Sequence, residues 1–219
     1  MSVDNTITLT IIGSNSRLFK NYCHELMLSK FNLVLLSYRD IYDYQVLINP
    51  IVFSYSKNTN MNKVFLESIL CRTKGKFTLI SSTAAAVSER TRFYNYPNIK
   101  HGSEKLVMKS LLDYYILRVG VLIVNDAEMS AYSGIIKKTT PKMIVEKIYE
   151  IYYEQNTECV FDLFEQTFVH NSRFKSLHFL LYFIYRKWGY FFYLLRPLDI
   201  IWRRIGFKNY GYTLISNTL

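Results

Sequence analysis

A tyrosine and a lysine, two residue types that can exchange protons, stand four positions apart where a helix is predicted to begin. Tyr96 follows Ser82, at the end of a predicted strand, by fourteen residues, and Lys100 completes the pair. This spacing places both side chains on one helix face, where the ammonium charge favours loss of the phenol's proton. A Ser82 hydroxyl could then bind the oxygen of a carbonyl or alcohol. The alternative is an exposed helix pair and a serine that only ends a strand.

A second candidate feature is a turn that could bind phosphate. The segment Gly13-Ser14-Asn15-Ser16 lies between a predicted strand and a predicted helix. Free backbone N–H groups and the positive end of the helix dipole favour a phosphate at such a helix N-terminus. A single glycine turn of this kind is more often only the connection between two elements.

Short β-branched runs alternate with segments of helical period over the first 165 residues. This alternation is typical of a parallel sheet covered by helices on both faces, so we expect a doubly wound, Rossmann-like α/β fold of about six strands. In the first helix, Leu18, Tyr22 and Leu26 form the expected apolar stripe, and Thr140 is the expected cap of the last. The expected strands are residues 6–12, 32–37, 45–49 (ended by Pro50), 77–81, 115–119 and 159–163, and the expected helices are residues 18–28, 59–72, 96–112 and 141–151.

Several of these features occur in the order found in a known family. Residues 7 to 165 resemble the short-chain dehydrogenase/reductase superfamily, particularly its extended and atypical branch of sugar-nucleotide epimerases, dehydratases and ketoreductases. The resemblance rests on segments in the family's order: Ile12-Gly13-Ser14-Asn15-Ser16, Val46-Leu-Ile-Asn49, Leu79-Ile-Ser-Ser-Thr83, the Tyr96/Lys100 pair with Glu104 one turn later, and Ile116-Leu-Arg118-Val-Gly120.

The resemblance implies a role for each matching residue. Tyr96 would be the catalytic acid/base, Lys100 would bind the nicotinamide ribose and tune Tyr96, and Ser82, with Thr83 as a substitute, would orient the substrate oxygen. Four residues would face the cofactor pyrophosphate: Gly13, Ser14, Ser16 and Arg17.

The cofactor's other contacts follow from the same resemblance. Arg39, just after the second predicted strand, lies where the family selects its cofactor, and an arginine there suits the 2′-phosphate of NADP, with NAD the alternative. Asn49 matches the asparagine that ends a strand in the family, and Asn58 loosely matches the one that opens the next helix.

The chain also departs from the family pattern at three places. Ser16 and Phe19 replace two glycines that bring backbone close to the pyrophosphate and helix close to strand, so we expect an altered turn. Only seven residues separate Ser37 from Gln45, which leaves no room for a βα unit that is common in the family. The region after Gly120, where substrate binds in the family, is short. These departures imply that the fold is retained and that cofactor binding is weakened or lost.

The last part of the chain has a different composition, so we expect a Rossmann-like domain over residues 1–165 and an amphipathic helical tail over residues 166–219. Residues 171–219 contain eight Lys or Arg and one Asp, which gives +7 of the net charge of +10. Between residues 174 and 207, twelve aromatic residues alternate with basic ones. This pattern predicts an in-plane anchor on an anionic membrane surface, and the alternative is packing on the domain or on a second subunit of a homodimer. Nucleic acid is disfavoured, because single-strand binders place such residues on a sheet or in a groove.

The remaining sequence features concern metal binding, the state of the cysteines and the location of the protein in the cell. The three cysteines, Cys23, Cys71 and Cys159, are widely spaced without a C-x-x-C pair, so we expect reduced, buried thiols. His101 and His170 have no second ligand at metal spacing, so we expect no metal. The N-terminus lacks the pattern of a signal peptide, and no apolar run is long enough to span a bilayer, so we expect a cytoplasmic protein, peripheral on the inner membrane face.

Two functional hypotheses follow. The first is an NAD(P)-dependent oxidoreductase, a ketoreductase acting on a nucleotide- or lipid-linked sugar in surface polysaccharide biosynthesis. The second is a non-catalytic Rossmann-like binding or scaffold protein at the membrane.

Overall fold

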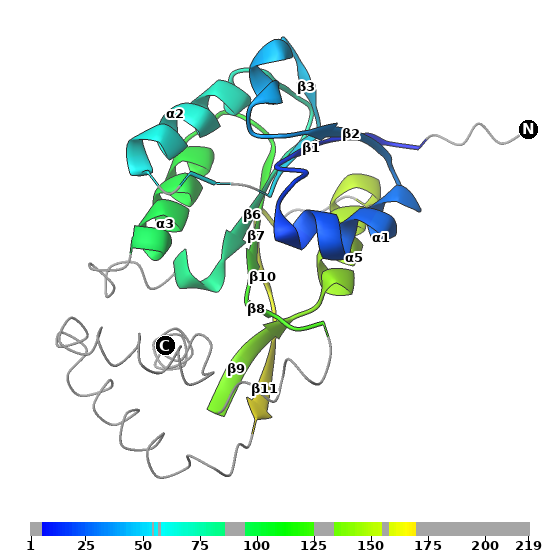
Figure 1. The fold of residues 1–219 in the computed structure, drawn as a ribbon, viewed down its shortest axis with the longest axis vertical. Coiled ribbons are helices and arrows are strands. Elements are labelled where there is room, and N and C mark those ends of the chain that lie inside the picture. Colours follow the sequence, from blue (N-terminus) through cyan, green and yellow to red (C-terminus); the bar gives the residue numbers. More distant parts are fainter. Residues whose placement is uncertain are drawn as a thin grey trace, which may run out of the picture.

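Six parallel strands form the central sheet of the computed structural model, which describes residues 6–53, 55–56, 58–85, 95–124, 134–154 and 158–169. Their order across the sheet is β10-β7-β6-β4-β1-β2 (Figure 1). The chain crosses from β2, at one edge, to β4 on the far side of β1, so the strand order reverses there. The strands are β1 (Thr8–Ile12), β2 (Asn32–Leu36), β4 (Pro50–Val52), β6 (Phe77–Ser82), β7 (Tyr114–Val119) and β10 (Val160–Leu163).

Helices cover both faces of this sheet. On one face lie α2 (Thr59–Leu70) and α3 (Asn95–Met108), and on the other lie α1 (His24–Leu28), preceded by the π-helical turn η1 (Phe19–Cys23), and α5 (Pro141–Tyr153) (Figure 1). The Thr140 hydroxyl accepts a hydrogen bond from the Met143 N–H at 3.3 Å, which confirms the predicted cap. The predicted parallel α/β fold with helices on both faces is confirmed.

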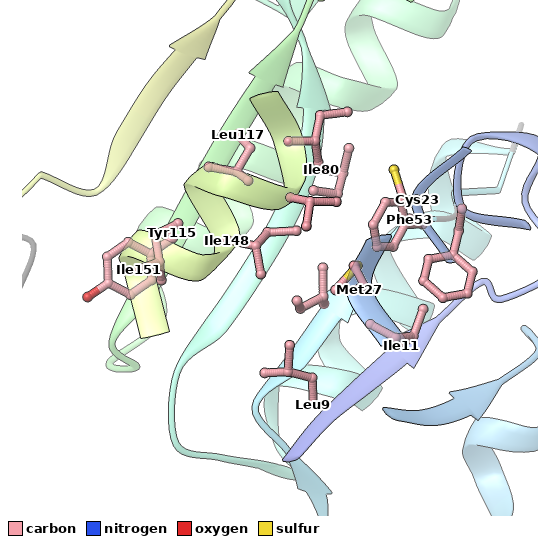
Figure 2. Packing of buried hydrophobic residues seen from close by; sticks show 14 of the residues in the cluster. Leu9, Ile11, Cys23, Met27, Phe53, Ile80, Tyr115, Leu117, Ile148 and Ile151 are labelled. Atoms are coloured by element: carbon pink, nitrogen blue, oxygen red, sulfur yellow. The ribbon is translucent and has the colours of Figure 1, made fainter. Parts of the chain in front are cut away.

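The core consists of two apolar layers, one under each pair of helices, because successive residues of a buried strand face opposite sides of the sheet. In β6 and β7, Ile80 and Leu117 face α5, whereas Leu79 and Ile116 face α2 and α3. Figure 2 shows the layer on the α1 and α5 side, where Cys23, Met27, Ile148 and Ile151 meet side chains from the strands. Each large apolar side chain buried in this way contributes about 1.5–3 kcal/mol to stability.

A smaller mixed sheet of three strands continues from the carboxyl ends of β7 and β10. Its order is β11-β9-β8, with strands β8 (Val121–Leu122), β9 (Gly134–Thr139) and β11 (Glu165–Val169). Gly120, between β7 and β8, lies so close to β9 that an added Cβ would be 2.1 Å from the Lys137 carbonyl oxygen. The Gly120 N–H donates to the Thr139 hydroxyl at 2.8 Å, and that hydroxyl donates to the Leu163 carbonyl. Glycine is needed here because the two backbones touch.

Two local predictions about the first half of the chain are wrong. The buried stripe of the first helix is Phe19, Cys23 and Met27, whereas Leu26 is 40% exposed. The π-helical turn has a longer repeat than an α-helix, so residues four apart stay on the buried face. The predicted stripe is displaced from it by one residue.

The second error concerns the third strand. Residues 45–49 do not form a strand of the main sheet that Pro50 ends: Pro50 is instead the first residue of β4. Only β3 (Leu47–Ile48) forms before it, and it pairs with β5 (Thr73–Lys74) in a separate two-stranded sheet. Proline lacks an N–H and is tolerated at the first residue of a strand. Asn49, with φ of 46°, makes the bend between the two strands.

The predicted absence of a βα unit after β2 is confirmed, because all residues between β2 and β4 are described and form only the 3-10 turn η2 (Asp40–Asp43) and β3. β11 runs across the predicted domain boundary after residue 165. The predicted tail segment at 174–207 lies outside the described residues. The prediction of buried thiols is right for Cys23 and wrong for Cys71 and Cys159, which are exposed. In the described part of the chain, no helix is both long enough and apolar enough to cross a membrane.

Candidate active site

The predicted catalytic residues meet at the carboxyl ends of the central strands. Ser82 is the last residue of β6, and Tyr96 and Lys100 lie in the first two turns of α3, which packs on β6 and β7. Gly13 follows β1 directly. In open α/β sheets, ligands bind at this edge, where the strand order reverses.

Lys100 is buried, with only 4% of its surface exposed. Its Nζ donates a hydrogen bond to the Ile80 carbonyl oxygen at 2.9 Å and lies 4.8 Å from the centre of the Tyr55 ring and 5.9 Å from that of Tyr96. Burial lowers the pKa of Lys100 from 10.5 to about 8, and the carboxylate of Glu104 opposes this shift. The alternative of an exposed Tyr96/Lys100 pair is therefore excluded for the lysine.

Tyr96 is half-buried, and its ring meets the ring of Tyr55 edge to face, with 5.2 Å between centroids and 66° between planes. Its backbone position four residues before Lys100 brings ring and ammonium together as the spacing predicted. Ser82, at the end of β6, is also half-buried, and its hydroxyl accepts a hydrogen bond from the Ala84 N–H at 3.3 Å. Thr83 is half-buried beside it.

A buried charge network supports α3 against the sheet. The carboxylate of Glu104, 2% exposed, accepts a hydrogen bond from the Ser81 hydroxyl at 2.6 Å and forms an ion pair with Arg118 at 2.7 Å. The Arg118 Nε also donates to both carboxylate oxygens, at 3.1 and 3.2 Å. Hydrogen bonding to Glu104 raises the pKa of Arg118. The network joins α3, β6 and β7 directly below Lys100 and Ser82.

The glycine turn is altered, as the replacements at Ser16 and Phe19 predicted. The N–H groups of Gly13 and Ser14 both donate to the Leu36 carbonyl at the end of β2, at 2.9 and 3.1 Å. The hydroxyl of Ser16 accepts from the Phe19 N–H at 3.3 Å. Phe19, only 1% exposed, packs on Phe53 with 5.2 Å between ring centroids. The N–H groups of Gly13 and Ser14 therefore hold the end of β1 to β2 and do not point to a ligand.

Arg17 and Arg39 lie on the surface near this edge of the sheet. Arg17 is exposed, and its Nη2 donates to the Tyr22 hydroxyl at 3.3 Å. Arg39 is exposed just after β2, and its N–H donates to the Ser37 hydroxyl at 3.3 Å. The Asp40 carboxylate beside it accepts from the Ser37 N–H, and hydrogen bonding to the side chain of Ser37, together with this backbone bond, lowers the pKa of Asp40.

Asn49 is not part of this site. Its Nδ2 donates to the carbonyl of Thr8, the first residue of β1, at 3.1 Å, and its Oδ1 accepts from the N–H of Lys76, just before β6, at 3.0 Å. Asn49 therefore lies at the amino ends of the strands, opposite the edge that holds Lys100. Its prediction as a cofactor contact depended on the incorrect third strand.

Asn58, which matched the family only loosely, caps α2. Its Oδ1 accepts from the N–H groups of Asn60 and Met61, at 3.0 and 3.1 Å.

Tyr55 also belongs to the candidate site, and no pattern in the sequence indicated it. It lies in the short segment between β4 and α2. In a chain with 19 tyrosines, nothing in the residues around it separates it from the others. Only the fold shows that it faces both Lys100 and Tyr96.

No protein-family model matches the sequence, and no curated protein matches it significantly. Comparison of structures finds similar folds. dTDP-4-dehydrorhamnose reductase from Bacillus anthracis, in complex with NADP, is 12% identical with a TM-score of 0.56, over 74% of this chain and 77% of that one. A short-chain dehydrogenase/reductase superfamily protein from Agrobacterium tumefaciens, with bound NAD, is 12% identical with a TM-score of 0.54, over 74% and 79%.

A third similar structure covers more of this chain. The capsular polysaccharide assembling protein CapF from Staphylococcus aureus is 13% identical with a TM-score of 0.52, over 97% of this chain and 64% of that one. At identities this low the likeness concerns the fold. The chain has the Rossmann-like fold of the NAD(P)-dependent short-chain dehydrogenases, reductases and epimerases.

Proposed function

We propose that this protein is an NAD(P)-dependent oxidoreductase of the short-chain type, which reduces a keto group of a nucleotide- or lipid-linked sugar or oxidises the matching hydroxyl. The observation that supports it most is the Tyr96/Lys100 pair at the carboxyl edge of a parallel sheet, with the ammonium buried and fixed on the Ile80 carbonyl. The sugar and a role in polysaccharide assembly are suggested by the reductase and the capsule protein that share the fold.

One residue at each end of the proposed cofactor site fits such a cofactor: Lys100 at the nicotinamide ribose and Arg39 at the adenosine ribose. An ammonium has three donors, and one of those on Lys100 is used by Ile80, so others remain for ribose hydroxyls. The exposed Arg39 guanidinium suits a 2′-phosphate, which favours NADP over NAD. When bound, the cofactor supplies or accepts the hydride.

The chain's own residues move the proton. In the reducing direction, the Tyr96 hydroxyl donates its proton to the carbonyl oxygen as negative charge develops there, and Ser82 donates a hydrogen bond to the same oxygen. The ammonium of Lys100, near the Tyr96 ring, stabilises the phenolate that remains. In the oxidising direction, Tyr96 takes up the proton from the substrate hydroxyl.

The test is calorimetric titration with NADPH and NADH, followed by turnover assays on nucleotide-linked keto sugars, beginning with dTDP-4-dehydrorhamnose. We expect NADPH to bind, and Tyr96→Phe to bind it equally well while turnover falls by about 10²–10⁴-fold. Tyr44→Phe, which removes the hydroxyl of an exposed tyrosine, is the control and should keep full activity. Full activity of Tyr96→Phe would refute this mechanism.

A second candidate function has its own supporting observation. The Gly13 and Ser14 N–H groups are used within the sheet, and β2 has no further strand beyond it in the main sheet of the described residues. A weakened nucleotide pocket of this kind suits a non-catalytic binding or scaffold protein. Absence of a response to both NADPH and NADH in the titration would favour the scaffold.

A further inference from the structure

The ammonium of Lys100 lies against two aromatic rings that come from different parts of the chain. Tyr96 is on the same helix, but the nearer ring, at 4.8 Å from Nζ, belongs to Tyr55 in the segment between β4 and α2. A cation at this distance from a ring centre is attracted by the negative face of the ring, more strongly where water is excluded. Lys100 is such a case because it is buried.

Tyr55 contacts the other member of the pair as well. Its ring meets that of Tyr96 edge to face at 5.2 Å, an arrangement favoured by the charge distribution of aromatic rings. One side chain therefore touches both residues that the proposed chemistry needs.

Hydrogen bonds fix the segment that carries Tyr55 to the helix that carries Lys100. The Ser56 N–H donates to the Asn62 Oδ1 at 3.0 Å, and the buried Asn62 Nδ2 donates to the Ser103 hydroxyl of α3 at 2.8 Å. Ser103 is three residues after Lys100. The position of the Tyr55 ring is thus set relative to α3 by a buried polar link.

We propose that Tyr55 is a positioning residue of this site, whose ring holds the Lys100 ammonium against the Ile80 carbonyl, keeps water away from it and orients the ring of Tyr96. The consequence for catalysis rests on the proposed function, whereas the effect on the ammonium does not. Three titratable groups face the Lys100 ammonium: Tyr55, Tyr96 and Glu104. A fourth charged group, Arg118 of β7, is paired with Glu104.

The first test measures Lys100 alone. The rate at which an amine-specific acylating reagent labels Lys100, read by mass spectrometry against pH, gives the midpoint of its titration. In Tyr55→Ala water reaches the ammonium, so the midpoint should rise by about 1–2 pH units from its wild-type value near 8. Tyr55→Phe keeps the ring and should keep the wild-type midpoint.

A matched control removes an aromatic ring that lies against a different cation, Arg72. The ring of Tyr42 lies 5.5 Å from the guanidinium carbon of Arg72, just beyond the far end of α2, so Tyr42→Ala should leave the Lys100 midpoint unchanged. If Tyr55→Ala fails to fold, Tyr55→Leu replaces it: leucine still excludes water but attracts no cation, so the midpoint should fall below that of the wild type. A wild-type midpoint in the folded variant, or a shift in Tyr55→Phe as large as in Tyr55→Ala, would overturn the proposal.

The second test addresses catalysis. Because misplaced groups slow the chemical step, Tyr55→Ala should lower kcat by about tenfold or more with little change in KM, and Tyr55→Phe should restore it. An unchanged kcat in an active Tyr55→Ala enzyme would overturn the catalytic part. If the wild-type protein binds neither NADPH nor NADH, the proposed function fails, and the labelling midpoints still decide the role of Tyr55.

Discussion

The buried ammonium of Lys100 lowers the stability of the folded protein, because its pKa of about 8 means that the folded state binds the proton more weakly than the unfolded state does. An unfolded chain holds the proton up to about pH 10.4. Below pH 8 both states are protonated, and the folded state bears a net cost of about 3 kcal/mol, which is the desolvation of the ammonium less its attraction to Glu104. Between pH 8 and 10.5 the unfolded state binds more protons, so stability rises with pH, and above that range the cost has gone.

We therefore predict a pH-dependent effect of Lys100→Met, which keeps the length of the side chain without its charge. At pH 7 the variant should be more stable than the wild type by about 3 kcal/mol, and the difference should vanish by about pH 10.5. Urea unfolding of both proteins from pH 7 to 11 measures it. Lys105→Met, an exposed lysine of the same helix, should change the unfolding free energy by less than about 0.5 kcal/mol. A constant difference across this range would contradict the assignment of the shift to Lys100.

Among single residues, the sequence correctly predicted those contacts that follow from spacing along one helix or one strand. Tyr96 and Lys100 meet because four residues make about one helical turn, and Ser82 lies at the same edge because it ends a parallel strand. Tyr55 could not be found, because its contact with Lys100 joins segments 45 residues apart. Asn49 was misplaced because a strand boundary shifted, and with it the end of the sheet at which the residue lies.

Among the elements, α3 is fixed to the sheet by the Glu104–Arg118 pair, and the placement of the proposed catalytic residues Tyr96 and Lys100 depends on that attachment. The carboxylate is 2% exposed and accepts from both Arg118 and the Ser81 hydroxyl. Asp162 of β10 lies 3.9 Å from the same guanidinium, which extends the network to the edge of the sheet. Because the Glu104 carboxylate is buried, loss of Arg118 leaves it without an ion-pair partner, whereas loss of Glu104 leaves the half-buried Arg118 with only the more distant Asp162.

A double-mutant cycle should show strong coupling between these two residues. Glu104→Leu and Arg118→Met should each lower the unfolding free energy by about 3–5 kcal/mol, and the double variant should lose much less than their sum, since no charge is left unpaired. Denaturant unfolding of the four proteins gives the coupling energy. The exposed pair Lys63–Glu67, at 3.7 Å on α2, is the matched control and should couple by less than about 0.5 kcal/mol. Additive single effects at Glu104 and Arg118 would show that the pair is not a unit.

The order and type of the main elements followed from the sequence, and their local irregularities did not. Hydrophobic period identified five of the six strands of the central sheet and the helices that pack on it, but it placed the remaining strand at residues 45–49 and not at β4. The π-helical turn begins at Phe19, whose ring packs on Phe53, a tertiary contact that local sequence does not reveal. The start of β4 at Pro50 depends on the bend at Asn49, whose side chain is held by β1 and by the residue before β6.

For the whole molecule, the net charge of +10 is divided unevenly. Residues 171–219 hold +7 of it, so the rest of the chain, which includes the candidate active site, has a net charge of only +3. This uneven division agrees with the proposal of an enzyme that acts on a lipid-linked sugar, since such sugars are held at a membrane. We therefore propose that the charge of residues 171–219 directs the protein to a membrane surface.

We predict that the full chain binds vesicles containing phosphatidylserine and not vesicles of phosphatidylcholine alone, with binding that weakens as salt is added. Each basic residue near an anionic surface contributes about 1 kcal/mol, so replacing Arg186, Lys187, Arg203 and Arg204 by Gln should weaken binding by about 10²–10³-fold. Flotation with such vesicles measures the bound fraction.

The control for this experiment removes the same charge from the body of the protein. Lys63, Lys105, Lys109 and Lys142 are exposed on helices α2, α3 and α5 or just after them, and their replacement by Gln lowers the net charge equally. If position decides, this variant should bind vesicles as the wild type does, because charges held away from a surface by more than a Debye length of about 8 Å are screened. Equal loss in both variants would mean that total charge drives the association, and unchanged binding in both would leave the aromatic residues as its cause.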